Sequence, residues 1–363
     1  MKRFIPFILI LLFSTVSFAG HLESKWEKTF NSVVLITSET VLAKEPITEP
    51  VPKEFFENSE PKQPPDFQAP KSILPKFVMG TGFFINEIHV VTNYHIIKDF
   101  DKIKIYAYNH PFEITDVKLV GYDAEIDIAV LEIGETVVHD ILKFSMVTPK
   151  VGDTVYALGH GLNQVWSLTK GILSYDYRRN PNTSFVHYIQ TDAVINSGNS
   201  GGPLLNESGE VLGVNTLLIS PDKYYVGYGY VIPTTLVERA VNQILATGQH
   251  VKPSIGIVMG IVDDKEQYKK LLSTNINHYL EVKEVMKDSP AYLFGVKAGD
   301  IIISIDGHDI QVMPNVIETL WKRYPGDTIT VKVYRNGEYF LIDIVLGKAE
   351  PVKENALPFG DTE

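Results

Sequence analysis

The sequence predicts a mainly β protein of at least two folded units, and three observations support this. From Phe77 to Pro233, many short apolar runs are separated by Gly, Asn and Asp, a pattern typical of an all-β barrel or sandwich. Residues 235–247 then change to helical periodicity. A second unit from about Lys252 contains Asn336-Gly337 between two apolar runs, which is a strong β-hairpin signal. The 363 residues are enough for two domains, or three compact units.

The first unit begins with a β-branched run at 33–37 that predicts a strand. The next segment, from Lys44 to Pro75, holds eight prolines mixed with Glu and Lys. Proline lacks a backbone donor and few apolar residues remain, so this segment cannot pair into a sheet. We interpret 44–75 as a long mobile loop inserted in the first barrel. The alternative is a linker between separate domains, which fails if strand 33–37 belongs to the fold that follows.

The remaining elements follow from the same patterns. In the helix, apolar side chains share one face, Thr235 with Glu238 forms a capping-box signal, and Gly248 ends the helix. Short helices fit 290–294 and 314–322, and the polar end 350–363 is expected to be a flexible tail. Strands are expected at 82–85, 89–92, 103–106, 128–133, 154–158, 211–215, 280–285, 301–305, 330–334 and 339–345.

Composition excludes several kinds of function. The net charge of −11 argues against a nucleic-acid partner, because binding phosphates needs a basic surface. The chain has no cysteine, which excludes disulfides, thiol catalysis and thiolate metal sites. The sequence shows no metal-ligand cluster, so we expect neither a metal nor a cofactor.

The N-terminus has the pattern of an export signal. Lys2 and Arg3 precede the apolar run 4–13, and Ser17-Phe18-Ala19 places small residues where a signal peptidase cuts. We therefore expect residues 1–19 to be a cleaved signal peptide and the protein to be periplasmic. The alternative is an uncleaved membrane anchor, although the apolar run is shorter than the roughly 20 residues that a span needs.

The segment 198–203, Gly-Asn-Ser-Gly-Gly-Pro, carries the strongest functional signal. A serine becomes a nucleophile when a base takes its proton and N–H donors meet the oxyanion, and flanking glycines allow the tight turn that aims them. The α/β-hydrolase elbow Gly-x-Ser-x-Gly also matches, but there a helix follows and the histidine comes later. Here a strand follows Ser200 and the best histidine lies upstream, which favours the order His, Asp, Ser.

His95 and Asp127 complete this order. His95 lies where an apolar strand, 90–92, leads into a turn, a position from which a base can face a cleft. Asp127 begins the apolar run 128–133, so its carboxylate needs a partner, and an imidazole N–H is a natural one. Asp127 would hold the tautomer of His95 and stabilise its protonated form.

These runs resemble the HtrA/DegP family of trypsin-fold serine proteases with a C-terminal PDZ domain. The resemblance is carried by 80–83 (Gly-Thr-Gly-Phe), 92–95, 127–131, 151–153 and, above all, 189–204. It implies two six-stranded chymotrypsin-like β-barrels in a protease domain at 20–250, followed by one α+β PDZ domain at 251–349. It also implies that His95, Asp127 and Ser200 are catalytic, and that the backbone N–H groups of Gly198 and Ser200 form the oxyanion hole.

The family further implies partners and a role. Its members are usually trimers built through N-terminal aromatic residues, for which Trp26 and Phe30 are candidates. They act in protein quality control and stress response outside the cytoplasm, cutting unfolded or misfolded proteins, and their PDZ domains bind peptide C-termini. The alternative hypothesis is a non-proteolytic chaperone or peptide-binding scaffold with a dormant catalytic site.

Two departures from the family pattern stand out. Residues 159–163 are Gly-His-Gly-Leu-Asn where the family often has Gly-Asn-Pro-Phe-Gly, so the conformation of this loop is open. Only one PDZ-like unit is present, which makes large cage assemblies that rely on two less expected.

Substrate contacts are expected on both sides of Ser200 and in the second unit. No acid lies at the base of the predicted pocket, so a basic side chain would be buried unpaired, and we predict cleavage after small or medium aliphatic residues. Ile255, Gly256 and Ile257 resemble the loop that binds the peptide carboxylate in PDZ domains, although an ordinary turn into a strand would have the same pattern. The predicted pocket residues are Val194, Ile195, Asn196, Val214, Asn215 and Thr216.

Overall fold

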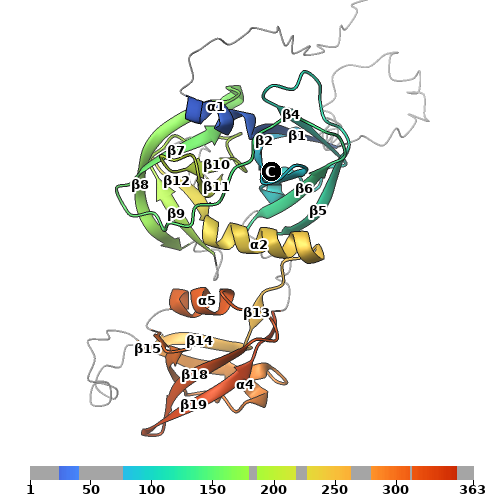
Figure 1. Cartoon of the computed structure of the whole chain (residues 1–363). Coiled ribbons are helices and arrows are strands. Elements are labelled where there is room, and N and C mark those ends of the chain that lie inside the picture. Colours follow the sequence, from blue (N-terminus) through green and yellow to red (C-terminus); the bar gives the residue numbers. More distant parts are fainter. Residues whose placement is uncertain are drawn as a thin grey trace, which may run out of the picture.

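The computed structural model describes residues 24–40, 77–179, 186–217, 227–262, 279–310 and 313–349. The predicted signal peptide, the Pro-rich segment 44–75 and the tail 350–363 lie outside these ranges. As the sequence predicts, the described fold is mainly β, with two β units side by side and a third unit below them (Figure 1). Within the described ranges, no helix is both long and apolar enough to cross a membrane.

The first unit is a six-stranded antiparallel sheet in the order β4-β1-β2-β3-β6-β5. Strand β1 pairs with β2 in the register Val33↔Phe83. The strand before the Pro-rich segment therefore pairs with the strand after it, which makes that segment an insertion within one sheet and not a linker. The strands are β1 (Val33–Glu39), β2 (Phe77–Phe84), β3 (His89–Thr92), β4 (Lys102–Ala107), β5 (Val117–Asp123) and β6 (Ile128–Ile133).

The second unit is a closed antiparallel barrel in the order β10-β11-β12-β9-β8-β7. In the first sheet the end strands β4 and β5 are not paired with each other, so closure by hydrogen bonding is a property of the second unit alone within the described chain. The barrel strands are β7 (Thr154–Gly159), β8 (Ser167–Arg179), β9 (His187–Thr191), β10 (Pro203–Leu205), β11 (Val211–Leu217) and β12 (Gly229–Pro233).

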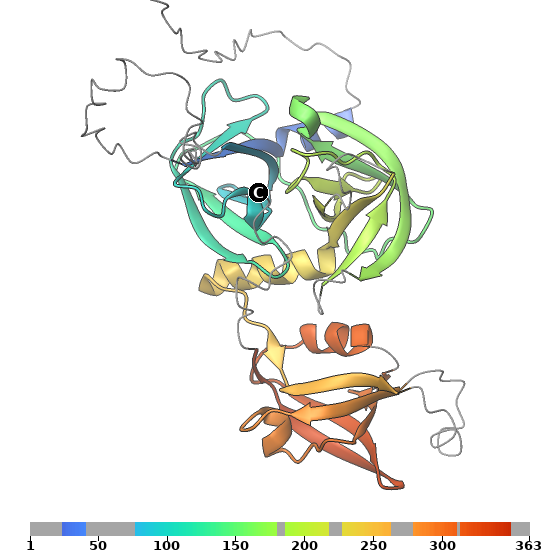
Figure 2. The ribbon, with the colours of Figure 1, turned by 180° about the vertical axis from the view of Figure 1, so that it is seen from behind.

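Two helices lie on opposite sides of the β units (Figures 1 and 2). Helix α1 (Ser24–Asn31) precedes β1, and α2 (Thr234–Thr247) follows β12. Helix α2 buries its apolar stripe, including Leu236, Val237 and Ile244, against both β units, and burial of each such side chain is worth about 1.5–3 kcal/mol.

The ends of α2 differ in how well the sequence predicts them. Gly248 has φ of 75° and its N–H donates to the carbonyl of Ile244, which confirms the predicted C-terminal signal. The prediction of a capping box between Thr235 and Glu238 is wrong. Pro233 is the N-cap and no side chain caps the helix, because Pro233 ends β12 in an extended conformation and the helix begins at Thr234. The Thr234 hydroxyl instead donates to the carbonyl of Val211.

The third unit is a sheet in the order β14-β15-β16-β18-β19, with β17 paired to β16. Asn336 and Gly337 have φ of 50° and 96°, as a tight hairpin turn between β18 and β19 requires. The linker strand β13 (Pro253–Ser254) pairs with β20 (Gly347–Lys348). The other elements are β14 (Ile257–Val262), β15 (Tyr279–Val285), α4 (Pro290–Leu293), β16 (Ile301–Ile305), β17 (His308–Asp309), α5 (Met313–Trp321), β18 (Thr328–Arg335) and β19 (Glu338–Val345).

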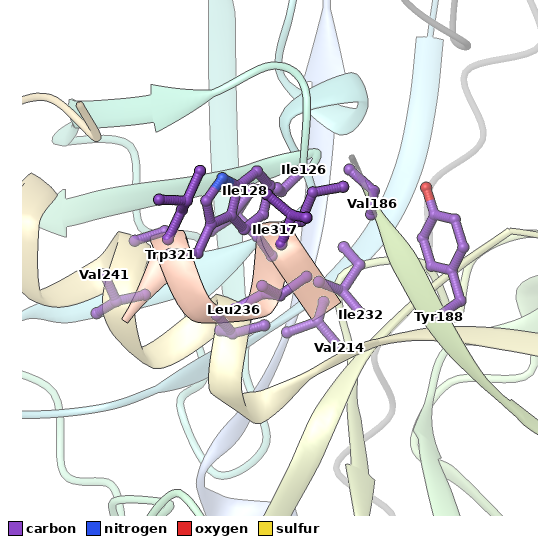
Figure 3. Packing of buried hydrophobic residues seen from close by; sticks show 14 of the residues in the cluster. Ile126, Ile128, Val186, Tyr188, Val214, Ile232, Leu236, Val241, Ile317 and Trp321 are labelled. Atoms are coloured by element: carbon purple, nitrogen blue, oxygen red, sulfur yellow. The ribbon is translucent and has the colours of Figure 1, made fainter. Parts of the chain in front are cut away.

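One apolar cluster extends across the units. Figure 3 shows Ile317 and Trp321 of α5 together with Leu236 and Val241 of α2 and with Ile126 just before β6. The third unit is therefore packed against the underside of the other two through α5, as the ribbon also shows (Figure 1).

Candidate active site

His95 is held by a short turn at the end of β3. The chain leaves β3 at Thr92, and the 3-10 turn η2 (Tyr94–Ile96) follows with Asn93 as its N-cap. The Asn93 side chain donates to the backbone carbonyl of Asp127 at 2.8 Å, which joins this turn to the start of β6. The side chain of His95 is 24% exposed, so one edge of the ring remains accessible.

Asp127 accepts hydrogen bonds on both carboxylate oxygens. Its Oδ2 lies 2.7 Å from Nδ1 of His95, and its Oδ1 accepts from the backbone N–H of His95 at 2.9 Å. A third donor, the hydroxyl of Thr216, reaches Oδ2 at 2.9 Å. The carboxylate is 1% exposed, so these bonds compensate the loss of water. This arrangement favours the tautomer with its proton on Nδ1, in which Nε2 is the basic ring nitrogen.

Ser200 lies in a turn whose backbone is bonded to both β units. The N–H of Asn199 donates to the carbonyl of Asn196, and that of Gly202 to the carbonyl of Asn199. The carbonyl of Ser200 accepts from the N–H of Thr81 in β2 of the first sheet. Gly201, with φ of 84°, admits this approach, because a Cβ there would lie 2.1 Å from the carbonyl oxygen of Thr81.

Thr216 connects Ser200 to Asp127. Its hydroxyl donates to Asp127, and its carbonyl accepts from the hydroxyl of Ser200 at 2.9 Å. One hydrogen-bond network therefore joins His95, Asp127 and Ser200. Asp127 lies 32 residues after His95 and 73 residues before Ser200 in the sequence. Sequence analysis had assigned Thr216 to the substrate pocket and gave no signal for this role.

The oxyanion turn is fixed from two sides. The Ser197 carbonyl accepts from the N–H of Leu162, and because a trans peptide directs its C=O and N–H oppositely, the N–H of Gly198 points away from that loop. The Gly198 carbonyl accepts from the hydroxyl of Thr81 at 2.6 Å. Within the described ranges, neither Gly198 nor Ser200 donates its N–H to a backbone carbonyl. These two N–H groups are therefore the candidate donors to an oxyanion.

His160, in the loop that departs from the family pattern, is fully buried beside this turn. Its backbone N–H donates to the Thr81 hydroxyl, and its Nδ1 accepts from the N–H of Trp166 at 3.0 Å. A Cβ on Gly198 would lie 2.4 Å from the His160 carbonyl oxygen, which shows how closely the two backbones pass. Burial lowers the pKa of His160 to about 4, so the ring is neutral where it packs.

This shift predicts a loss of stability in acid. Because the folded pKa of about 4 is below the ordinary value of 6.5, the unfolded chain binds the proton more readily, and stability falls as pH drops from 6.5 toward 4. The total loss of folding stability is on the order of 3 kcal/mol, because each unit of pKa shift is worth about 1.4 kcal/mol. His160→Asn cannot titrate but can still accept from Trp166. Urea unfolding from pH 7 to pH 4 should show wild type losing more stability than the variant, and parallel curves would contradict this.

The comparisons with known proteins agree with this geometry. Residues 80–214 match the model of the trypsin-like peptidase domain, and residues 253–346 match that of the PDZ domain. The serine protease Do-like HtrA of Bacillus subtilis is 36% identical over 276 residues, covering 72% of this chain and 61% of the relative. A DegP-like probable periplasmic serine endoprotease of Chlamydia trachomatis is 30% identical over 271 residues, covering 74% of this chain and 54% of that protein.

A solved structure of the HtrA-type protease AlgW with decapeptide has a TM-score of 0.70 and 25% identity, and the match covers 90% of this chain and 98% of that one. The chain belongs to the HtrA family. It spans only slightly more than half the length of the first curated relatives it matches. These relatives are named as proteases, so the comparisons do not favour the non-proteolytic alternative.

In this HtrA chain, most of the predicted pocket side chains are not available to a substrate. Ile195 and Val214 are buried in the apolar core, and Asn215 is also fully buried, with its side chain donating to the Pro203 carbonyl. Thr216 is directed at Asp127. Only Val194, which is 38% exposed, and the half-buried Asn196 present surface, so the pocket assignment is restricted to these two.

The predicted carboxylate loop of the PDZ domain lies at the start of β14. Gly256 has φ of 73°, and a Cβ there would lie 2.3 Å from that of Ser289, so only glycine fits. Ile255 is buried, and its carbonyl accepts from the N–H of Ala291. Ile257 begins β14, and among the described strands β14 pairs with β15 alone, which leaves β14 at the edge of the described sheet.

The two aromatic residues expected to join subunits are covered by their own chain. Trp26 and Phe30 of α1 are 8% and 7% exposed. The ring of Trp26 packs 4.5 Å from Tyr156, and that of Phe30 packs 5.5 Å from Tyr108, measured between ring centres. They therefore hold α1 across the top of the two β units.

Proposed function

We propose that this chain is an exported serine endopeptidase that cuts unfolded or misfolded proteins. The observation that carries the proposal is the network in which Asp127 bonds to His95 and, through Thr216, to Ser200. The trypsin-like peptidase match and the protease names of the relatives support it.

The reaction follows from the positions of these groups. The Ser200 hydroxyl leaves the Thr216 carbonyl, passes its proton to Nε2 of His95 and attacks the peptide carbonyl carbon. The N–H groups of Gly198 and Ser200 bind the oxyanion, each worth about 3–4 kcal/mol of transition-state stabilisation. His95 then protonates the leaving amine, and the acyl-enzyme is hydrolysed by a water that His95 activates. Asp127 stabilises the protonated imidazole throughout.

The PDZ domain is proposed to bind peptide C-termini. An extended peptide would add to the free edge of β14, with its carboxylate at Ile255, Gly256 and Ile257. We further propose a periplasmic location, supported by the names of relatives, and a homotrimer. Because Trp26 and Phe30 are already covered, subunits would meet over the outside of this aromatic layer.

The function is tested by digesting a reduced, unfolded protein with the purified chain and mapping every cut by mass spectrometry. We expect cuts after Val, Ala, Ile or Leu, because neither Val194 nor Asn196 carries a negative charge that could pair with a buried cation. The same protein in its folded state serves as the control and should resist cleavage. Cuts mainly after Lys or Arg would overturn the pocket assignment, and an absence of cuts would overturn the proposed function.

A further inference from the structure

Strand β19 forms an exposed apolar edge of the PDZ sheet. Among the described strands it pairs with β18 alone, and it lies at the side of the PDZ domain away from the two β units (Figures 1 and 2). Leu341 is 73% exposed, and Tyr339 and Phe340 are exposed beside it. Edge strands of soluble proteins usually carry charges or proline that prevent pairing with another chain, and residues 339–342 contain neither.

Helix α4 extends this apolar surface. Ala291 of α4 is buried in the same cluster as Ile344 of β19, so the helix lies on the core face of the strand. Three large side chains in and just after the last turn of α4, Tyr292, Leu293 and Phe294, are nevertheless exposed. A strand added along β19 would therefore find apolar surface both on the edge itself and beside it.

The pairing with β18 fixes which side chains of β19 share a face. Phe340 and Ile342 lie opposite buried valines of β18, so they belong to the core face. Leu341 and Asp343 alternate with them and lie on the outer face, where Leu341 is opposite Lys332. Any strand that joins this edge must match both faces, because a shift by one residue would exchange them.

The outer face carries one charge of each sign near the edge. The carboxylate of Asp343 accepts from the hydroxyl of Thr330 at 2.7 Å, and Nζ of Lys332 lies 4.7 Å from the ring centre of Tyr339. Within the described part of the chain, neither charge has an ion-pair partner. A joining strand with an acid opposite Tyr339 would bring that acid close to Lys332.

A second copy of β19 meets these requirements. In an antiparallel pair with Leu341 opposite Leu341 of the other copy, Phe340 faces Ile342 and Tyr339 faces Asp343. The two-fold symmetry repeats each pair, so both acids approach a Lys332. Shifting one strand by two residues either places Asp343 opposite Leu341 or moves it past the end of the other strand. Charge complementarity therefore selects the register centred on Leu341.

We propose that two copies of this chain join edge to edge through β19, in the antiparallel register centred on Leu341, so that one sheet continues across both PDZ domains. The contact pairs the backbone groups of the open edge and buries the apolar side chains of residues 339–342. It lies far from α1, the side at which the proposed homotrimer would form, so it would join two such assemblies (Figure 1). The proposal does not rest on the protease function.

The register is tested with single cysteines, because the chain has none of its own. In the full chain carrying Ser200→Ala to prevent self-cleavage, Leu341→Cys should form a disulfide between two chains when treated with oxidised glutathione. Directly opposite residues have Cα atoms about 4.5–5.5 Å apart, within the range of about 4.4–6.8 Å that a disulfide needs.

The matched control is Val345→Cys, on the same strand, the same face and also exposed. In the proposed register the two copies of residue 345 are eight positions apart, or about 26 Å at 3.3 Å per residue. This variant should therefore stay unlinked under the same treatment. Equal cross-linking of the two variants would mean random collision and would overturn the proposal.

The assembly is tested by sedimentation of full-length chains at the cross-linking concentration. Wild type should have twice the mass of Leu341→Glu, which places two like charges opposite each other. Asp343→Lys should halve the mass as well, because it meets Lys332 of the other copy, and the exchange Lys332→Asp with Asp343→Lys should restore it. The control Val138→Glu adds a charge at a site that is 94% exposed between β6 and β7 and should keep the wild-type mass.

Two other results would also decide against the contact. A mass that Leu341→Glu does not change would show that β19 is not the interface, and a charge exchange that fails to restore the mass would overturn the register. If wild type has the smaller mass at every concentration while amide hydrogen exchange at 339–343 is slow, another part of the same chain covers the edge, and the proposal fails.

Discussion

Ser200→Ala should abolish proteolysis, lowering kcat by about 10⁶-fold, because the nucleophile and the proton that His95 receives are both removed. A fluorophosphonate probe should label wild type at Ser200 and leave the variant unlabelled. The fold should survive, since the change deletes one hydrogen bond to the Thr216 carbonyl, worth about 1 kcal/mol of stability.

The control for this change is Ser208→Ala, in the exposed turn between β10 and β11, which should keep full activity and labelling. Both variants should show the near-ultraviolet circular dichroism and thermal transition of wild type. Undiminished cleavage by Ser200→Ala, in a preparation free of other proteases, would remove Ser200 from the mechanism.

Asp127→Asn should lower kcat by about 10⁴-fold while leaving KM almost unchanged. The amide would offer an N–H to Nδ1 of His95, so the ring would carry its proton on Nε2 and could not accept one from Ser200. The His95 backbone N–H would still bond to the remaining amide oxygen, and the amide could donate its second N–H to the Thr216 hydroxyl, which should keep the fold close to wild type. The measurement is steady-state kinetics on a peptide substrate, with the downfield proton NMR signal of the His95 Nδ1–H recorded in parallel.

Glu132→Gln is the matched control, because Glu132 on β6 faces His89 on β3 at 3.7 Å, at the other end of the same strand pair. The Glu132→Gln variant has the same carboxylate-to-amide change, but the neighbouring histidine, His89, lies outside the network of His95, Asp127 and Ser200. Its kcat should equal that of wild type, and an equal loss in both variants would mean that the effect of Asp127→Asn is not specific to His95.

Sequence patterns predicted strands well where one strand face is buried. The strands at 89–92 and 128–133 have the predicted bounds, because apolar runs between turn residues leave little choice of register. Local patterns could not predict the role of Thr216. Side chains alternate along β11, and which face meets Asp127 depends on how the second unit packs against the first.

The buried ion pair between Asp123 and Lys252 shows a second limit of sequence reasoning. Asp123 and Lys252 are separated by 129 residues, and each looks like an ordinary surface charge in its own segment. Burial of an ion pair is a tertiary property, so neither periodicity nor spacing reveals it.

The proposed catalytic network is divided between halves of the chain that are made one after the other. His95 and Asp127 come from the first sheet, while Ser200 and Thr216 come from the second, and Thr81 of the first sheet holds the turn of the second. A chain that emerges N-terminus first therefore has no working centre until residue 216 has arrived and both halves have met. The order of synthesis therefore delays the proposed chemistry until both halves are in place.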